Sequence, residues 1–301
     1  MENSGRKKIN PCVHVALKEN AAYKSFERSP RPCTRHTSYF FAYTDLLEKY
    51  RGKKITFVEI GVLNGGSLFM WRELLGNDAR IIGIDLNSNA LNFKDNGFEI
   101  VIGNQASPTF WRNFFEKTGP VDVVLDDGGH TYEQQIITAH ECIPHINDGG
   151  MIIIEDTHTS YFSEYGYPSR YSFIEWSKTT IDRINARHPE AASSKRKPHP
   201  IIYSAQFFES IVCLNIDRRR CLISKPISNG KEGTTTLDFR HSDSIVLRAQ
   251  QASSLLSRKF EFVKKFPRVH KILEKVNLKL LNLIARISAR RRNSRLRIYF
   301  K

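Results

Sequence analysis

Two apolar runs that each end in a pair of carboxylates constrain this chain more than any other feature. Residues 121–130 read VDVVLDDGGH, and residues 149–160 read GGMIIIEDTHTS. A buried parallel strand is a continuous apolar run, and ligands of open α/β sheets bind just beyond the carboxyl ends of such strands. If the two strands are neighbours, their terminal acids meet at one edge of the sheet. These acids are Asp126, Asp127, Glu155 and Asp156. Crowded carboxylates repel one another and are costly to bury without a cation, a proton or a charged substrate, so the pattern predicts an enzyme with an oxygen-ligand metal site.

Strand-like and helix-like segments alternate around these runs. Ser107-Pro108 is typical of a helix start, and Thr131 with Gln134 is typical of a capping box. Strands are expected at 55–61, 79–86, 98–104, 121–128 and 149–156, with helices at 67–75, 108–117 and 131–145 between them. The alternation predicts an α/β fold with a Rossmann-like, doubly wound, mostly parallel sheet. The segments 205–216 and 219–226 are expected to close it as a C-terminal antiparallel strand pair.

The positive charge is concentrated at one end of the chain. Of the 46 Lys and Arg residues, 15 lie in residues 257–301, which hold 2 of the 31 Asp and Glu residues. The remaining chain is nearly neutral, which argues against a nucleic-acid footprint across the whole protein. With 301 residues, the chain can hold one large α/β domain plus extensions. We expect a flexible N-terminal arm over 1–35, the domain over 36–242 and a basic helical tail over 243–301.

The cysteines and the hydropathy pattern favour a cytoplasmic protein. The five cysteines show no metal-ligand spacing, and Cys142 and Cys213 lie in apolar segments typical of a core. A reduced compartment is the simplest account of this usage. The first twelve residues lack the apolar centre of a signal peptide, and no apolar run approaches the ~18 residues of a spanning helix.

A glycine-rich turn joins the first expected strand to the first expected helix. In VEIGVLNGGSL (58–68), Gly61 and Gly65 let backbone amides approach a ligand, and the following helix N-terminus favours negative charge. The spacing is not the GxGxxG of dinucleotide binders, and such a turn alone can be a tight connection. With Glu59 before it and Asp85 at the end of the next strand, where an acid can hold ribose hydroxyls, the turn predicts cofactor binding.

This combination resembles the class I S-adenosylmethionine-dependent methyltransferases. The resemblance narrows to a metal-dependent sugar O-methyltransferase family that includes the mycinamicin and rhamnosyl O-methyltransferases and is related to cephalosporin-hydroxylase-like proteins. It rests on VEIGVLNGGSLFMW, GIDL, GNQASP, VDVVLDDGGH, GGMIIIEDTHTSY and AQFFESIVC, which occur in that order. It covers about 55–226 and implies that 36–242 is a methyltransferase domain acting on a hydroxyl of a sugar, a glycosylated natural product or an envelope glycan.

The resemblance also implies roles for single residues. Asp127, Glu155 and Asp156 would hold Mg²⁺ (or Mn²⁺), and hard carboxylate oxygens suit these ions. His130 would act as the general base beside Asp127. The implied cofactor-binding residues are Glu59, Gly61, Gly65, Ser67, Asp85, Asn104, Gln105 and Asp126. The chain departs from the family in having DDGGH where DDGSH is common, and in having Asn104 where an Asp is frequent.

Plainer interpretations stay open. Asp126 and Asp127 can cap the turn into the next helix, Glu155 and Asp156 can begin a solvated loop, and His130 can be a helix-entry residue. A hydroxylase or oxidoreductase on the same scaffold is the first alternative function, although no two-His-one-carboxylate spacing is evident. A non-catalytic binding module and an RNA methyltransferase are further alternatives.

The basic tail has an apolar stripe. Its members recur every three or four residues and are Val269, Ile272, Leu273, Val276, Leu280, Leu283, Ile284 and Ile287. A basic amphipathic helix can lie on an anionic membrane, which would place 266–297 at the inner face of the membrane near a lipid-linked glycan. Packing on the body or on another subunit is the alternative. We expect a sugar- or diol-containing substrate, a homo-oligomer and no nucleic acid as partner.

Overall fold

The computed structural model of the protein describes residues 11–231, 245–259 and 266–300. The chain divides into two compact units, Met1–Pro226 and Ile227–Lys301, and each is described by itself. Residues 1–10, 232–244, 260–265 and 301 lie outside the described residues.

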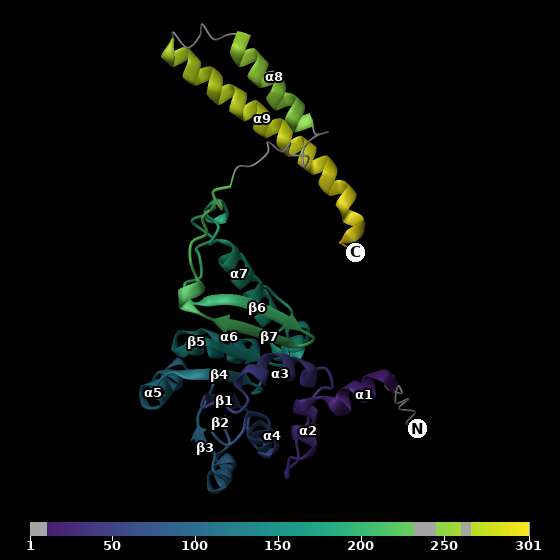
Figure 1. Cartoon of the computed structure of the whole chain (residues 1–301), viewed down its shortest axis with the longest axis vertical. Coiled ribbons are helices and arrows are strands. Elements are labelled where there is room, and N and C mark those ends of the chain that lie inside the picture. The colour runs from purple at the N-terminus through teal and green to yellow at the C-terminus, as the bar shows by residue number, and fades with distance from the viewer. Residues whose placement is uncertain (1–10, 232–244, 260–265, 301) are drawn as a thin grey trace. The chain divides into compact units, whose positions relative to one another are not determined.

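A seven-stranded sheet forms the centre of the first unit (Figure 1). Its strands are β1 (Thr56–Ile60), β2 (Arg80–Asp85), β3 (Glu99–Ile102), β4 (Val121–Asp126), β5 (Ile146–Ile154), β6 (Ile202–Phe208) and β7 (Ile211–Ile216). Their order is β3-β2-β1-β4-β5-β7-β6. Neighbours from β3 to β5 pair in parallel, whereas β7 pairs antiparallel with both β5 and β6. The doubly wound, mostly parallel sheet with an antiparallel C-terminal pair is therefore confirmed.

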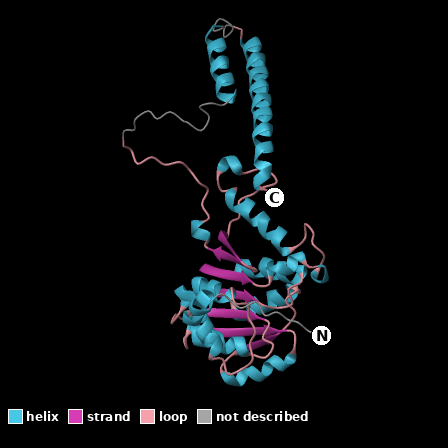
Figure 2. Ribbon diagram, turned by 90° about the vertical axis from the view of Figure 1, so that its right-hand side faces the viewer, coloured by secondary structure: helices cyan, strands magenta, loops and turns pink. Residues whose placement is uncertain are grey.

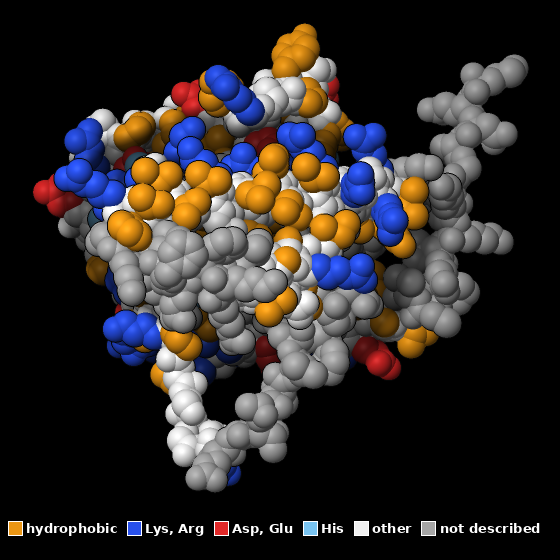
Figure 3. Space-filling model, turned by 90° about the horizontal axis from the view of Figure 1, so that it is seen from above, with side chains coloured by type: hydrophobic (Ala, Val, Ile, Leu, Met, Phe, Trp, Pro, Cys, Tyr) orange, Lys and Arg blue, Asp and Glu red, His pale blue; other side chains and the backbone are white. Residues whose placement is uncertain are grey.

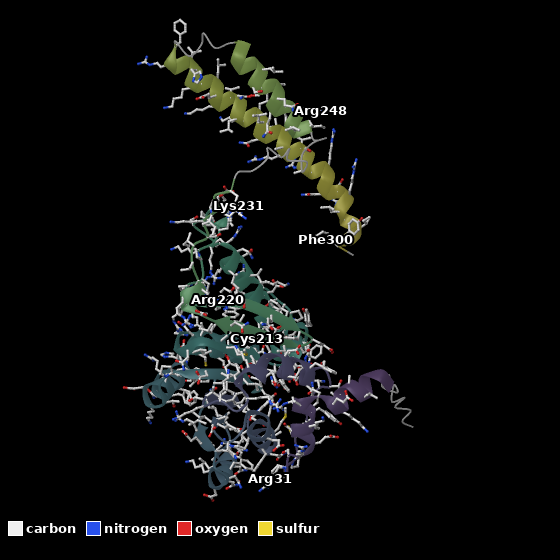
Figure 4. All side chains as sticks on the ribbon, in the orientation of Figure 1. Arg31, Cys213, Arg220, Lys231, Arg248 and Phe300 are labelled. Atoms are coloured by element: carbon white, nitrogen blue, oxygen red, sulfur yellow. The ribbon has the colours of Figure 1, made fainter. Side chains whose placement is uncertain are left out.

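Helices cover both faces of this sheet (Figure 2). Alternate strand residues point to opposite faces, so Phe57 and Val123 belong to one core while Val58 and Val124 belong to the other. The first core is closed by α2 (Ala21–Glu27), α3 (Tyr39–Leu47) and α4 (Gly66–Leu75). The second is closed by α5 (Pro108–Thr118), α6 (Tyr132–Cys142) and α7 (Phe173–Asn185). Cys142 and Cys213 are fully buried, as expected; Figure 4 labels Cys213 on β7.

The predicted helix starts are formed by the expected side chains. Ser107 accepts a hydrogen bond from the Phe110 amide at the start of α5, with Pro108 in the first turn. Thr131 and Gln134 form the capping box of α6. These local signals were readable in the sequence because each acts within four residues.

The N-terminal segment differs from the loose arm that the sequence indicated. It forms α1 (Pro11–Glu19) and α2, and α2 packs against α3 and α4. Leu17 and Ala22 are buried, and the Ser29 hydroxyl donates to the main-chain oxygen of Gly66. A few apolar residues in an otherwise polar stretch pack this segment against α3 and α4. The stretch is too short for its hydrophobic periodicity to predict this packing.

The closing strand pair is placed differently from the prediction. The segment 205–216, expected as one strand, holds the end of β6 and all of β7, joined by a turn at Glu209 and Ser210. Ser210 adopts φ 59°, which a tight hairpin turn needs and which few non-glycine residues adopt. Residues 219–226, expected as the second strand, contain the end of a short 3₁₀ turn (Arg218–Arg220) and no strand.

The second unit is a helical hairpin of α8 (Ile245–Lys259) and α9 (Pro267–Leu296), followed by a 3₁₀ turn (Arg297–Tyr299). The two helices contact each other along their length. α9 confirms the helix expected from 266 onward. Within the described ranges, every helix is too short or too polar to cross a bilayer.

Candidate functional site

The predicted acids meet at one edge of the sheet because β4 and β5 are neighbours. Asp126 pairs in register with Ile154, so the residues that follow each strand leave it side by side. The Asp127 amide donates to the Ile60 carbonyl of β1, and the Glu155 amide donates to the Asp126 carbonyl. The main chain thus carries Asp127, Glu155 and Asp156 to the same carboxyl edge.

Arg35, from the N-terminal segment, reaches into this group of acids. One guanidinium nitrogen lies 2.6 Å from Asp127 Oδ2 and another donates to Glu59 Oε1 at 3.1 Å. Its Nε lies 4.0 Å from Glu155 Oε2. The Arg35 side chain is only 8% exposed. No local pattern marks Arg35 in the sequence, although the crowding of acids indicated that a compensating cation was needed.

Glu155 is completely buried and faces the interior. Its Oε1 accepts a hydrogen bond from the Tyr43 hydroxyl at 2.6 Å, and its Oε2 has no hydrogen-bond partner within the described part of the chain. Burial, and next the charge of Asp127, raise the pKa of Glu155 well above its usual value. Burial likewise raises the pKa of Asp127, while Arg35 opposes that shift.

The Asp156 carboxylate lies between Tyr39 and His130. Its backbone adopts φ 53°, an unfavourable conformation for a non-glycine residue. Oδ1 accepts a hydrogen bond from the Tyr39 hydroxyl. Oδ2 lies 3.1 Å from His130 Nε2. Asp156 therefore connects α3 with the loop after β4.

His130 is held with its ring beside two carboxylates. Its Nε2 lies 3.1 Å from Asp156 Oδ2 and 3.9 Å from Asp127 Oδ1, while Nδ1 has no hydrogen-bond partner among the described residues. The backbone adopts φ 59°, and the Thr159 hydroxyl donates to the His130 carbonyl. An imidazole fixed by a carboxylate is the arrangement of a general base with an orienting partner.

Two groups of side chains have the spacing that a metal ion requires. One ligand atom each from Asp127, His130 and Asp156 lie within 4.8 Å of one another, and the same holds for His36, Asp156 and His158. Glu155 belongs to neither group. The second group has two imidazoles and one carboxylate, a set that the sequence did not reveal because His36 lies 120 residues before Asp156.

A cavity of about 450 Å³ lies beside the acids, at the carboxyl ends of β1, β2 and β4. Among the residues expected to bind a cofactor, Gly61, Ser67, Asp85, Asn104 and Gln105 line it, together with Asp127 and His130. Residues 32–35 of the N-terminal segment form another part of its wall. A side chain at Gly61 would be impossible, since its Cβ would lie 2.0 Å from the Asp127 carbonyl oxygen and φ is 92°. This close approach of two loops shapes the cavity floor.

Several expected cofactor residues hold the loops instead of lining the cavity. Glu59 is buried and accepts hydrogen bonds from Ser67 and Trp71, and burial raises its pKa to about 7. Gly65 begins α4 with φ 73°, and a Cβ there would strike the Phe93 ring.

Asp85, which also lines the cavity, and Asp126 both accept hydrogen bonds from main-chain amides. Asp85 Oδ2 accepts from the Val62 and Leu63 amides. Asp126 accepts from the Gln105 side chain and the Gly128 amide, and burial raises its pKa to about 6. These contacts fix the two loops that border the cavity.

Residues 58–157, about a third of the chain, match a family model described as a methyltransferase domain. Residues 58–157 carry a methyltransferase domain.

This chain is similar to curated O-methyltransferases over part of its length. It is 29% identical over 175 residues to 8-demethyl-8-alpha-L-rhamnosyl tetracenomycin-C 2'-O-methyltransferase of Streptomyces olivaceus, covering 54% of this chain and 45% of that protein. It is 30% identical over 125 residues to demethylmacrocin O-methyltransferase of Streptomyces fradiae, covering 39% and 31%. The chain thus spans less than half the length of these relatives.

A solved structure shares the fold of the methyltransferase domain. The MycE methyltransferase from the mycinamycin biosynthetic pathway, solved with Mg, SAH and mycinamycin VI, superposes with a TM-score of 0.56 at 22% identity. The match covers 73% of this chain and 57% of that chain.

Proposed function

We propose that this domain transfers a methyl group from S-adenosylmethionine to a hydroxyl of a sugar-containing acceptor, assisted by a divalent cation. One observation carries the proposal: Asp127 and His130 line the cavity of about 450 Å³ beside the glycine-rich loop. The same two residues also belong, with Asp156, to the group of side chains close enough to share a metal ion. A methyl donor in the cavity and a hydroxyl at the acids would therefore be neighbours. The curated relatives are O-methyltransferases of glycosylated natural products.

The cavity residues fit S-adenosylmethionine. The absence of a side chain at Gly61 lets the loop after β1 approach the loop after β4 at the cavity floor, and the Asn104 side chain and the amides of the glycine loop offer polar contacts. The positively charged sulfonium would be favoured beside Asp127 and the other carboxylates. Asp85 Oδ2 already accepts hydrogen bonds from two loop amides. Asp85 would therefore bind the ribose through its remaining lone pairs.

The acids partly fit Mg²⁺ or Mn²⁺. Asp127 and Asp156 come close enough to share a cation, and Glu155 has one buried oxygen without a partner. Arg35 already neutralises part of this charge, so Asp127 Oδ1 is the oxygen left to face the cation. A divalent ion bound there would lower the pKa of a coordinated acceptor hydroxyl. His130 would accept the hydroxyl proton, and Asp156 would stabilise the imidazolium.

A second cavity provides a place for the acceptor. It has a volume of about 390 Å³ and is lined by His158 and Tyr161 after β5, by α7, and by Phe207 and Phe208 of β6. Tyr161 and Phe207 are 65% and 47% exposed, so flat apolar surfaces face this cavity. His158 Nδ1 lies 3.9 Å from Asp156 Oδ1, which joins the cavity to the acid group. Aromatic walls with a few polar groups suit a glycosylated molecule. A homo-oligomer, a lipid-linked acceptor and a cytoplasmic location stay predictions.

The test separates cofactor binding from turnover. Calorimetry should show that S-adenosylmethionine binds both the unchanged protein and Asp127→Asn. Methyl transfer to a panel of glycosylated acceptors should disappear with Asp127→Asn or EDTA, whereas exposed Asp95→Asn should leave it unchanged. Transfer that survives both EDTA and Asp127→Asn would rule out metal assistance. Failure to bind S-adenosylmethionine would rule out the function itself.

A second candidate function rests on the group of His36, Asp156 and His158. Two imidazoles and one carboxylate with open positions are the ligand set of non-haem iron oxygenases. A hydroxylase on this scaffold would consume O₂ when Fe²⁺ is supplied and would not consume S-adenosylmethionine. Methylated product without O₂ uptake would exclude it.

A further inference from the structure

The described part of the C-terminal hairpin contains no buried core. None of the side chains described between residues 227 and 300 is buried. Six apolar residues of α9 that recur every three or four positions are between 45% and 55% exposed: Val269, Leu273, Val276, Leu280, Leu283 and Ile287. They form one face of the helix, about 27 Å long from Val269 to Ile287 at ~1.5 Å per residue. We call this set the apolar face of α9. So continuous an apolar face on a separate helical unit marks an interaction surface.

α8 packs beside the apolar face and leaves it open. The Asn277 side chain donates to the Ser253 hydroxyl at 2.7 Å, which marks the side of α9 that meets α8. Leu281 and Ser288 are half-buried on that same side. At about 100° per residue, this side lies roughly 60–100° from the centre of the apolar face at Leu280.

A basic row borders the other side of the apolar face. It consists of Lys271, Lys275, Lys279, Arg286 and Arg290. α9 holds nine Lys and Arg residues and a single acid, Glu274. Figure 3 shows the result as a row of hydrophobic side chains with Lys and Arg side chains along one flank. Apolar side chains and cations therefore face outward together.

We propose that the apolar face and basic row of α9 dock on an anionic lipid surface, with the helix lying in the plane of the interface. An apolar face of this kind inserts at the boundary between headgroups and acyl chains, while Lys and Arg contact anionic headgroups. Tyr299 and Phe300 follow α9 and are 77% and 86% exposed, and Figure 4 labels Phe300 at this end. Aromatic side chains are enriched at such interfaces.

Other occupants fit this surface less well. Nucleic acid would pair with the cations but would leave the apolar face in water. A second copy would cover the apolar face but would bring two basic rows together, and like charges at an interface are repulsive. Anionic lipid satisfies both features at once.

The test uses the full chain and vesicle flotation. Phosphatidylcholine vesicles containing phosphatidylglycerol should recover at least about tenfold more protein than vesicles of phosphatidylcholine alone, and added salt should reduce this recovery. Leu280→Asp should lower recovery by a similar factor. Leu278→Asp is the matched control, because it adds the same charge at an equally exposed leucine about 160° away on α9. It should retain binding.

Several results would overturn the proposal. Equal recovery with the two vesicle types would exclude anionic lipid as the occupant. Equal loss from both substitutions, with helicity unchanged by circular dichroism, would exclude the apolar face. A dimer in solution that Leu280→Asp converts to monomer, together with no vesicle binding, would assign the surface to a second copy. Vesicle binding is measured without cofactor or acceptor, so its failure leaves the proposed methyl transfer untouched.

Discussion

Replacing Arg35 with Met should destabilise the first unit most strongly at alkaline pH. Met keeps an apolar stem of similar length but removes the charge that lies 3.1 Å from Glu59 and 2.6 Å from Asp127. Removing one partner from a buried ion pair typically costs about 3–5 kcal/mol, because the remaining charge stays buried and unpaired. The 8% exposure of Arg35 places it in this class. We therefore expect a loss of about 3–5 kcal/mol in the free energy of unfolding at pH 8.

The pH dependence gives the prediction its sharper test. Burial raises the pKa of Glu59 from 4.5 to about 7, so the folded protein binds more protons than the unfolded chain between these values. The contribution of Glu59 to the free energy of unfolding therefore falls as pH rises from 4.5 through about 7. The total fall is about 3 kcal/mol, because each pKa unit corresponds to about 1.36 kcal/mol. Without Arg35 the pKa of Glu59 should rise further. The loss of unfolding free energy caused by Arg35→Met should therefore be smaller at pH 5, where the Glu59 carboxyl group is protonated.

The assay is urea unfolding followed by tryptophan fluorescence, since all three tryptophans lie in the first unit. Arg31→Met is the matched control: Arg31 lies four residues earlier in the same segment, is exposed, and is labelled in Figure 4. It should cost less than about 1 kcal/mol at either pH. Equal stability of the two variants at pH 8, or a larger Arg35→Met loss at pH 5, would refute the reasoning.

Three further substitutions test the loops and the acid group. Gly61→Ala should abolish cofactor binding in calorimetry or unfold the loop, because its Cβ would meet a carbonyl oxygen at 2.0 Å; Gly97→Ala, with φ 81° but nothing within 4 Å, isolates the backbone strain and should bind normally. His130→Ala should lower the turnover number by about 10²–10⁴-fold while cofactor affinity persists, and an unchanged rate would exclude it as the base. Tyr43→Phe should cost about 1.5–3 kcal/mol in urea unfolding because it removes a bond to a buried carboxylate; Tyr50→Phe, which loses a bond to a neutral main-chain oxygen, should cost about 0.5–1.5 kcal/mol, and the reverse order would contradict this.

The parallel part of the fold could be predicted because its signals are local. The apolar runs of β1 to β5 and the caps at Ser107 and Thr131 each act over a few residues, and their alternation implies the sheet. The hairpin at Ser210 was missed because a serine with positive φ has no sequence signature. Continuous apolar character across 205–216 therefore concealed the turn.

The residues of the candidate site likewise divide into those that local sequence patterns predict and those that they do not. Asp127 and Asp156 were found because they directly follow strands, and a parallel sheet aligns strand ends. Arg35 and Tyr43 were missed because their partners lie far away in the chain, and nothing local in a polar N-terminal segment marks a residue destined for burial. The roles expected for Glu59 and Asp126 stay predictions; both are buried and hold neighbouring loops.

The wall that residues 32–35 contribute to the cavity has a practical consequence for dissecting this protein. Deleting the chain up to α3 would remove both one wall of the 450 Å³ cavity and the Arg35 guanidinium that neutralises the acids. Lost turnover in such a shortened protein would then say nothing about which of the two mattered. Single replacements at position 35 are the way to tell containment of the ligand apart from charge balance.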